Sequence, residues 1–403
     1  MKIAILGFGT VGSGVYEIIK DNREVIKNKT GLDIVTKYIL DIRDFSDRED
    51  AHIFTKDFDI ILNDSDVDAV VETIGGIEPA YTFSVKALEK GKTVITSNKE
   101  LVATKGNELM QCAVENNAKY LFEASVGGGI PIIRPLFHCY TCNNIVSLSG
   151  ILNGTTNYIL TKMFKDGESF EKALLQAQQN GYAERDPSAD VDGHDTCKKI
   201  CILSSIASGK SVNFKDIDTQ GISKITLEDT KYASKLGFSI KLIGECIMTE
   251  SEKMEIHVAP MLVAKDNMLS SIEDVYNGVV VKGDMVSDTL HYGRGAGKLP
   301  TASAVVADVI EFGQNTNIPY MRPWKVCNEN VVIDRGEYVR NYFVRLKGSY
   351  AKSDISKIVG VKAFEQMFDG ECGFISEKIS YNELLNKLSC ANADVITVIE
   401  IKK

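Results

Sequence analysis

Short apolar runs alternate with longer amphipathic segments over the first third of the chain. The short runs predict buried strands at residues 2–6, 34–40, 68–74, 93–97 and 120–124. The segment between the first two strands predicts a helix, because one apolar face is formed at helical spacing by Val15, Ile18 and Ile19. Another helix is predicted between the third and fourth strands, over residues 81–90, and stops at Gly91. Strands that alternate with helices are typical of an α/β domain with a doubly wound, parallel sheet.

The middle of the chain shows a different pattern. Its strands and helices are expected at residues 144–152, 153–163, 170–180, 241–248, 254–263 and 279–282. Long excursions separate them, which predicts an α+β domain over residues 131–299 rather than continued double winding. A helix after Pro300 is expected to return to the first domain, so we assign residues 1–130, completed by about 300–325, to that domain.

The last part of the chain predicts a small module of its own. Its strands and helices are expected at residues 342–347, 353–364, 373–378, 381–388 and 394–401. A short βαββαβ module over residues 340–403 fits this order.

Composition narrows the class of protein. With 403 residues the chain has room for two or three domains, and 44% apolar and 25% charged residues are ordinary for a globular protein. A net charge of −9 without a long basic run argues against nucleic acid and anionic membranes as partners. No apolar run approaches the roughly 20 residues that span a bilayer. Nine scattered cysteines fit a reducing cytosol, so a cytoplasmic location is expected.

A glycine motif follows the first strand at once. The residues from Gly7 to Gly12, GFGTVG, match G-x-G-x-x-G and open a helix. The glycines allow a tight turn, and the helix N-terminus presents N–H groups to a pyrophosphate. This context predicts a Rossmann dinucleotide-binding domain, with a glycine turn that binds no nucleotide as the alternative. Asp41 suits NAD and Arg43 suits the 2′-phosphate of NADP, so the cofactor stays open.

Further polar positions follow other predicted strands. Thr73 and Lys99 lie at carboxyl ends of strands, where open α/β sheets bind ligands. A lysine that opens a helix opposes the helix dipole, which favours a functional reason for Lys99. The glycine loop at residues 125–131 could bind a hard cation through its carbonyl oxygens or could serve as a linker. A second glycine loop lies at residues 292–298.

The most charged stretch precedes an apolar helix. Residues 184–192 hold four acids, and Asp195 follows four positions before Lys199. On a helix these two side chains are neighbours, so both heads can reach one spot. A solvated acidic loop is the ordinary alternative. It is weaker here because the apolar helix CKKICILSSIA predicts burial, and a desolvated lysine suggests a chemical task.

Seven blocks in the same order resemble homoserine dehydrogenases over nearly the whole chain. They are GFGTVG, VVETIGG, TSNKELVA, EASVGGGIPII, LSGILNGTTNYIL, GYAERDPSADVDGHDTCKK and GRGAGKLPTASAVVADV. The tail looks like a regulatory ACT domain. The resemblance implies the reversible reduction of L-aspartate 4-semialdehyde to L-homoserine with NADP or NAD, in the biosynthesis of threonine, methionine and isoleucine.

The resemblance also implies roles for particular residues. Lys199 corresponds to the proton donor and Lys99 lines the reacting centre, while Glu184 and Asp195 hold the substrate with Asp190 in support. The resemblance and the glycine motif together imply that the cofactor contacts Gly7, Phe8, Gly9, Thr10, Val11, Gly12, Arg43, Thr73, Lys99 and Gly297. A structural monovalent cation, expected to be sodium, corresponds to backbone carbonyls of Glu123, Val126, Gly128 and Ile130. A homodimer through the middle domain is implied, and higher assembly through the tail stays open.

Two alternatives compete with this interpretation. One is another oxidoreductase of the same superfamily that acts on an amino acid or semialdehyde. The other is a catalytically silent, nucleotide-sensing regulator, against which Lys99, Lys199 and Glu184 argue because all three are intact. The tail departs from the family, since LKGSYAKSD stands where a Pro-Gly turn is usual, so it is structural or answers an effector other than threonine. Both lysines are expected to meet in one pocket between two lobes.

Overall fold

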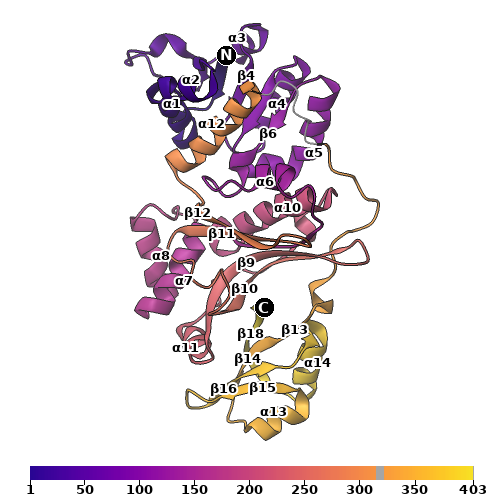
Figure 1. Cartoon of the computed structure of the whole chain (residues 1–403). Coiled ribbons are helices and arrows are strands. Elements are labelled where there is room, and N and C mark those ends of the chain that lie inside the picture. The colour runs from indigo at the N-terminus through magenta and orange to yellow at the C-terminus, as the bar shows by residue number, and fades with distance from the viewer. Residues whose placement is uncertain (315–321, 403) are drawn as a thin grey trace. The chain divides into compact units, whose positions relative to one another are not determined.

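The chain, described here by a computed structural model over residues 1–314 and 322–402, forms two compact units (Figure 1). Unit 1 comprises Met1–Cys142, Cys201–Phe214 and Gly293–Cys327. Unit 2 comprises Asn143–Ile200, Lys215–Tyr292 and Asn328–Lys403.

Unit 1 is built on a six-stranded parallel sheet with the order β3-β2-β1-β4-β5-β6. Its strands are β1 (Lys2–Leu6), β2 (Val35–Leu40), β3 (Phe54–Thr55), β4 (Ala69–Glu72), β5 (Thr93–Thr96) and β6 (Tyr120–Leu121). The predicted doubly wound parallel sheet is confirmed. Strand β3 was not expected, because two residues are too few to produce an apolar run.

Helices pack around this sheet. They are α1 (Thr10–Asp21), α2 (Arg23–Thr30), α3 (Phe58–Asn63), α4 (Ala80–Glu89), α5 (Lys99–Glu115), α6 (Ile133–His138) and α12 (Lys298–Gln314), with 3₁₀ turns η1 (Ala51–Ile53) and η2 (Glu123–Ser125). Helix α12 comes from far along the chain and packs on α1. The contact depends on Gly14, because a Cβ there would lie 3.0 Å from the Cβ of Ala302.

Unit 2 is built on a larger mixed sheet with the order β12-β11-β7-β9-β10-β18-β14-β16-β15, and β8 pairs with β10. The strands before the tail are β7 (Ile145–Ile151), β8 (Asp218–Thr219), β9 (Phe238–Met248), β10 (Met254–Ala264), β11 (Tyr276–Gly283) and β12 (Ser287–Arg294). The helices before the tail are α7 (Gly154–Asp166), α8 (Phe170–Gln179), α9 (Ser188–Val191), α10 (His194–Ser208), η3 (Phe214–Asp216) and α11 (Leu227–Lys235). The residues of α10 from Cys201 on, and the first residue of η3, belong to unit 1. Strands β9 and β10 pair antiparallel along their whole length.

The tail of unit 2 has the predicted βαββαβ order, with two additional two-residue strands that pair with each other. Its elements are η4 (Arg335–Glu337), β13 (Val339–Arg340), β14 (Tyr342–Lys347), α13 (Lys352–Ile358), β15 (Val361–Glu365), β16 (Glu371–Ser376), β17 (Ile379–Ser380), α14 (Tyr381–Cys390) and β18 (Asp394–Lys402). The helix predicted over residues 353–364 is wrong in its second half. Helix α13 ends at Ile358 because extended Val359 and then Gly360 break it, and β15 follows.

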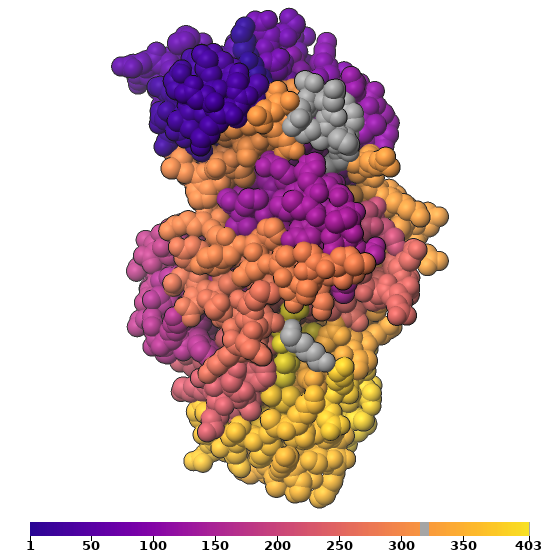
Figure 2. Space-filling view, viewed as in Figure 1, coloured from indigo at the N-terminus to yellow at the C-terminus, as the bar shows by residue number. Residues whose placement is uncertain are grey.

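The tail is joined to the rest of unit 2 by its last strand. Strand β18 pairs parallel to β10, with Met261 opposite Glu400, and antiparallel to β14. In Figure 2 the yellow residues of the tail lie directly against the pink and orange residues of unit 2. Among the described residues, no helix combines the length and the apolar character needed to cross a bilayer.

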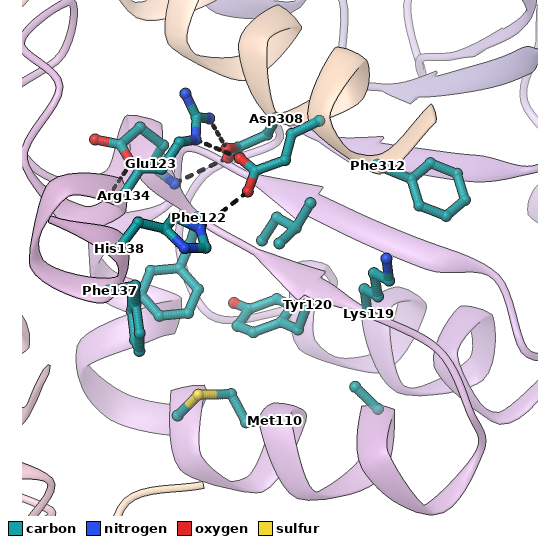
Figure 3. Close-up of a pocket in the computed structure, with 13 residues that line it drawn as sticks. Met110, Lys119, Tyr120, Phe122, Glu123, Arg134, Phe137, His138, Asp308 and Phe312 are labelled. Carbon is teal, nitrogen blue, oxygen red and sulfur yellow. Dashed lines mark hydrogen bonds and ion pairs between the residues drawn. The ribbon is translucent and has the colours of Figure 1, made fainter. Parts of the chain in front are cut away.

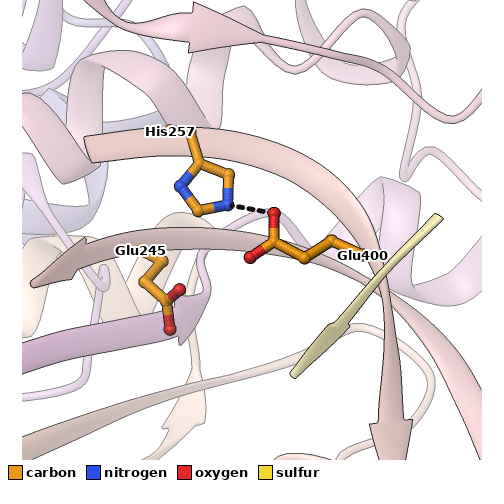
Figure 4. A group of neighbouring side chains, drawn as sticks. All are labelled: Glu245, His257 and Glu400. Atoms are coloured by element: carbon orange, nitrogen blue, oxygen red, sulfur yellow. Dashed lines mark ion pairs between the residues drawn. The ribbon is translucent and has the colours of Figure 1, made fainter. Parts of the chain in front are cut away.

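A buried cluster of acidic and basic side chains lies where β18 pairs with β10, a junction that we call the seam at β18 (Figure 4). The ligand-type atoms of Glu245, His257 and Glu400 lie within 4.8 Å of one another, and His257 Nε2 is 3.1 Å from Glu400 Oε2. Three bases already flank the acids: Lys402 pairs with Glu245, while Arg335 and Arg340 flank Glu400. We therefore interpret the cluster as an ion-pair network rather than a metal site.

Replacement of Glu400 by Gln should destabilise unit 2 by about 3–5 kcal/mol, because it leaves buried bases without their partner. Burial alone would raise the pKa of Glu400, but His257 and the two arginines outweigh it and lower the pKa to about 2. The pKa of this carboxyl is therefore lower in the folded protein than in the unfolded chain, where it is about 4.3. The carboxylate stabilises the fold above about pH 4.3, and this stability is lost as the pH falls towards 2. Urea denaturation followed by fluorescence from pH 7 down to pH 3 measures both effects.

The matched control for this experiment is Glu383→Gln. Glu383 pairs with Lys387 on the exposed side of α14, and such pairs contribute about 0–1 kcal/mol. Equal losses in the two variants, or an unchanged acid dependence in Glu400→Gln, would contradict the buried network as a source of stability.

Candidate functional site

The glycine motif of unit 1 forms a tight turn ahead of α1. Gly7 has φ +92°, and a Cβ on Gly12 would lie 1.9 Å from the carbonyl oxygen of Gly7. Gly9 precedes the first residue of α1, Thr10, and no atom lies within 4 Å of the place where its Cβ would be. The turn is therefore as tight as glycine permits, and the backbone is open at the helix N-terminus, where a pyrophosphate binds in such domains.

Thr73 supports this turn from the neighbouring strand. Its hydroxyl oxygen lies 3.0 Å from the carbonyl oxygen of Leu6 and 2.9 Å from that of Gly7, so these two acceptors share its one hydrogen. The predicted residues Phe8 and Val11 are half-buried beside it, with Phe8 packed edge-on against Phe54. The structure thus brings these predicted cofactor residues together in one region of unit 1.

Asp41 and Arg43 form a closed pair next to the turn. Asp41 Oδ2 accepts from the backbone N–H of Phe8 (2.7 Å), and both oxygens of Asp41 accept from the guanidinium of Arg43 at 2.8–2.9 Å. These bonds, the Arg43 side chain first, hold the pKa of Asp41 well below its usual range. The side chain of Asp41 is 7% exposed and that of Arg43 is 56% exposed, so the surface presented here is cationic.

A buried glutamate that was not predicted lies beside Asn98, the N-cap residue of α5. Glu72 ends β4, and its carboxylate accepts from the hydroxyl of Thr96 (2.6 Å) and from the backbone N–H of Ile74 (2.7 Å). Burial raises the pKa of Glu72. Asn98 caps α5 through Leu101 N and donates to the carbonyl of Gly76. Lys99 is the first residue of α5 and is half-buried.

The glycine loop after β6 is organised by Glu123 (Figure 3). The buried carboxylate of Glu123 accepts from the backbone N–H groups of Ile132 (2.7 Å) and Arg134 (2.6 Å). Gly127 and Gly128 have φ of +79° and +53°, a conformation that favours glycine. A Cβ on Gly128 would lie 2.5 Å from the carbonyl oxygen of Gly295, so the second glycine loop packs on the first. Gly297, with φ +118°, ends this second loop just before α12.

A cavity of about 180 Å³ lies beside Glu123. Figure 3 shows Arg134 reaching Asp308, to which it donates at 2.6 Å, and it also pairs with Glu311. Burial and the charge of Glu123 raise the pKa of Asp308 to about 7. These groups tie α12 to the segment that carries the predicted cation loop.

In unit 2 the predicted neighbours Asp195 and Lys199 form a buried ion pair. Lys199 Nζ lies 2.7 Å from Asp195 Oδ2 and donates to the carbonyl oxygen of Leu152 at 2.8 Å. Lys199 is 8% exposed and Asp195 is 6% exposed. The expectation of a desolvated lysine on α10 with an acid one turn before it is confirmed.

Asn153 links this pair to Asp190. Its side-chain nitrogen donates to Asp190 Oδ1 (2.6 Å) and to Asp195 Oδ2 (2.9 Å). Burial and the charge of Asp195 raise the pKa of Asp190. Asn153 was predicted to begin a helix, and its contacts with the acids were not predicted, although Asn at a strand-to-helix junction is itself a capping signal.

Of the four predicted residues in unit 2, three therefore come together: Asp190, Asp195 and Lys199. Glu184 lies on the exposed loop between α8 and α9, where its carbonyl oxygen accepts from Gln178. Lys99 belongs to unit 1.

Comparison with known proteins covers the whole chain. A family model described as "Homoserine dehydrogenase" matches residues 131–310, and one described as "Homoserine dehydrogenase, NAD binding domain" matches residues 7–123. A homoserine dehydrogenase of Neisseria gonorrhoeae is 38% identical over 91% of this chain and 86% of its own length. One of Lactococcus lactis is 33% identical over 99% and 92%.

Solved structures agree. The crystal structure of a homoserine dehydrogenase from Thiobacillus denitrificans matches with a TM-score of 0.93 at 33% identity, covering 100% of this chain and 98% of that one. A hyperthermophilic archaeal homoserine dehydrogenase in complex with NADPH matches with a TM-score of 0.68 at 28% identity, covering 80% and 99%. The resemblance of the seven sequence blocks is thereby confirmed, and the chain belongs to the homoserine dehydrogenase family, the NAD(P)-dependent oxidoreductases of amino-acid biosynthesis.

Proposed function

We propose that the enzyme interconverts L-aspartate 4-semialdehyde and L-homoserine, with Lys199 as the proton donor to the aldehyde oxygen. The observation that carries this proposal is the buried ammonium of Lys199, held 2.7 Å from Asp195. A carboxylate at this distance favours the charged form of a lysine, which is the form that can give a proton.

The chemistry requires such a group. The reduced nicotinamide, when bound, supplies the hydride to the aldehyde carbon. Negative charge then develops on the oxygen, and a proton from Lys199 converts it to the hydroxyl of homoserine. In the reverse direction the neutral amine of Lys199 accepts that proton. Lys99 adds a second positive charge for the developing oxyanion.

The acids of unit 2 suit the other end of the substrate. Both the semialdehyde and homoserine carry an ammonium group, and a charged group removed from water needs a partner. Glu184 and Asp195 are proposed as its ligands, with Asp190 in support. The exposure of Glu184 leaves its carboxylate accessible to an incoming substrate.

For the cofactor, the contacts of Asp41 favour NADPH over NADH. Both carboxylate oxygens of Asp41 are already hydrogen-bonded, so they are poorly placed to accept from a ribose hydroxyl. The exposed guanidinium of Arg43 is available to a 2′-phosphate. The glycine turn, Thr10, Val11, Thr73 and Gly297 are proposed to hold the rest of the dinucleotide.

A monovalent cation, sodium in our proposal, would be held by the carbonyl oxygens of Glu123, Val126, Gly128 and Ile130. The residues fit because the turn is set by left-handed glycines and offers hard oxygen ligands. Such an ion would have a structural role. It would fix the loop that connects β6 to α6.

The tail over residues 340–403 is proposed to be an ACT-like module, with residues 1–130 and 131–299 as the nucleotide-binding and catalytic domains. The strand order β18-β14-β16-β15 and the two helices support this. A cytoplasmic location is proposed from the nine free cysteines, which fit a reducing compartment.

The enzyme is also proposed to be a homodimer through unit 2. Met285 (80% exposed), Val286 (44%) and Tyr292 (54%) lie on or beside β12, the edge strand of the large sheet. An open edge with large apolar side chains is typical of a covered interface.

Light scattering should give twice the 44.3 kDa of one chain, and Met285→Asp should lower that mass. A monomeric wild type at micromolar concentration would overturn this part.

Replacement of Lys199 by Ala should lower kcat at least about 100-fold in both directions, because the proton donor is lost, while the Kd for NADPH stays within about 2-fold. The assay follows NADPH absorbance with aspartate semialdehyde and, in reverse, with homoserine. The neighbour Lys198 offers a matched control, and Lys198→Ala should keep most of the activity. Unchanged turnover in Lys199→Ala would remove this residue from its role, and an inactive wild type would remove the proposed reaction.

Replacement of Arg43 by Ala should lower kcat/KM for NADPH about 10–100-fold, since a charge-assisted hydrogen bond to phosphate is worth about 1.5–3 kcal/mol. The value for NADH should change less than about 3-fold. Arg23, which pairs with Asp33 on the surface of the same unit, supplies the control variant Arg23→Ala. Equal losses with both cofactors would contradict a contact with the 2′-phosphate.

A further inference from the structure

Asn153 occupies the junction between a strand and a helix in unit 2. Strand β7 ends at Ile151 and α7 begins at Gly154, and Asn153 between them has an extended backbone (φ −129°, ψ 119°). The residue is 5% exposed. Its buried amide must therefore find partners for all of its polar atoms within the protein.

The amide has one orientation only. Asn153 Oδ1 accepts from the backbone N–H of Thr156 at 2.9 Å and so caps α7. This contact turns the NH₂ group the other way, where it donates to Asp190 (2.6 Å) and to Asp195 (2.9 Å). A flipped amide would place its nitrogen against an N–H donor and its oxygen against two carboxylates.

We propose that Asn153 is a positioning residue, which holds the carboxylates of Asp190 and Asp195 side by side and thereby sets the pH range over which Lys199 can act as a proton donor. This inference rests on the proposed function of Lys199. Asn153 itself acts through the two acids and through the lysine that pairs with one of them.

The electrostatic reason lies in the crowding of like charges. Two buried carboxylates repel, and one of them takes up a proton unless donors favour the charged forms. Burial and the charge of Asp195 already raise the pKa of Asp190. If Asp195 took the proton instead, Lys199 would lose its counter-charge. The two N–H groups of one amide reduce the repulsion by serving both acids at once.

The charged groups around the amide come from two helices. Asp190 lies on α9, and Asp195 and Lys199 lie on α10. The neighbouring strand and helix contribute neutral groups: the Leu152 carbonyl oxygen accepts from Lys199, and the hydroxyl of Thr155 faces Asp190. Two acids and one base in a buried cluster make its proton balance sensitive to one added or lost hydrogen-bond donor.

Few other side chains could do this. Asp would cap α7 equally well but would add a third carboxylate in place of two donors. Ser would cap the helix but has a single hydroxyl hydrogen. Ala would remove both the cap and the donors. The pair Asn153→Asp and Asn153→Ala therefore separates the structural role of the residue from its electrostatic role.

The experiment measures pH–rate profiles between pH 6 and pH 10 and the melting temperature of each variant. Asn153→Asp should keep the melting temperature at pH 8 within a few degrees of the wild-type value. It should lower kcat at pH 7.5 about 10–100-fold. Both limbs of its pH–rate profile should move to higher pH by about one unit, because the extra negative charge favours the protonated forms of the neighbouring groups. The KM for NADPH should not change. Asn153→Ala should lower the melting temperature and kcat together. Ser380→Ala, which removes a helix cap in the tail, should leave the profile unmoved.

A second readout is independent of turnover. Carbon-13 NMR of the aspartate carboxyls should show one more proton taken up near neutral pH in the Asn153→Asp cluster than in the wild type. An inactive wild type would count against the proposed reaction, while this titration would still judge Asn153. A wild-type pH profile in Asn153→Asp, or a titration without the extra proton, would overturn the inference.

Discussion

The burial of the ammonium group of Lys199 is the constraint on which the packing around β7 and α10 in unit 2 depends. A buried charge is costly unless it is paired and hydrogen-bonded. The chain meets this requirement from two elements: Asp195 one helical turn earlier on α10, and the carbonyl oxygen of Leu152 at the end of β7. The ion pair is therefore also a tie between a helix and a strand, and the role proposed for the lysine depends on the packing of both.

That packing depends on residues with very small side chains. Helix α10 lies on the central strand β9 at Gly244, where an added Cβ would approach Thr196 to 3.1 Å and Ile200 to 3.2 Å. A larger residue would lift the helix from the sheet and with it the lysine. At the next junction Gly154 begins α7, and a Cβ there would lie 2.8 Å from the carbonyl oxygen of Val275. Close approach of backbone thus fixes α10, which carries Asp195 and Lys199, and the start of α7, which Asn153 caps.

The sequence predicted what depends on periodicity and local spacing. The parallel sheet, the tight turn from Gly7 to Gly12 and the Asp195–Lys199 pair all follow from patterns within about twenty residues. Sequence reasoning missed Glu72, Asn153 and the network around Glu400, because the partners of each are brought close by tertiary pairing. Glu400 meets His257 across 143 positions only because β18 adds to β10.

The seam at β18 bears on how the tail can act. Strand β18 pairs with β10, β10 pairs with β9 along its whole length, and β9 carries the glycine on which α10 rests. The tail and the lysine helix therefore share one continuous sheet. The register contacts and the buried contact between Glu400 and His257 oppose any sliding of β18, since packed sheets respond in discrete steps rather than by smooth deformation. A signal from the tail would consequently have to twist or release this sheet as a whole, and the strand that receives it first is β10.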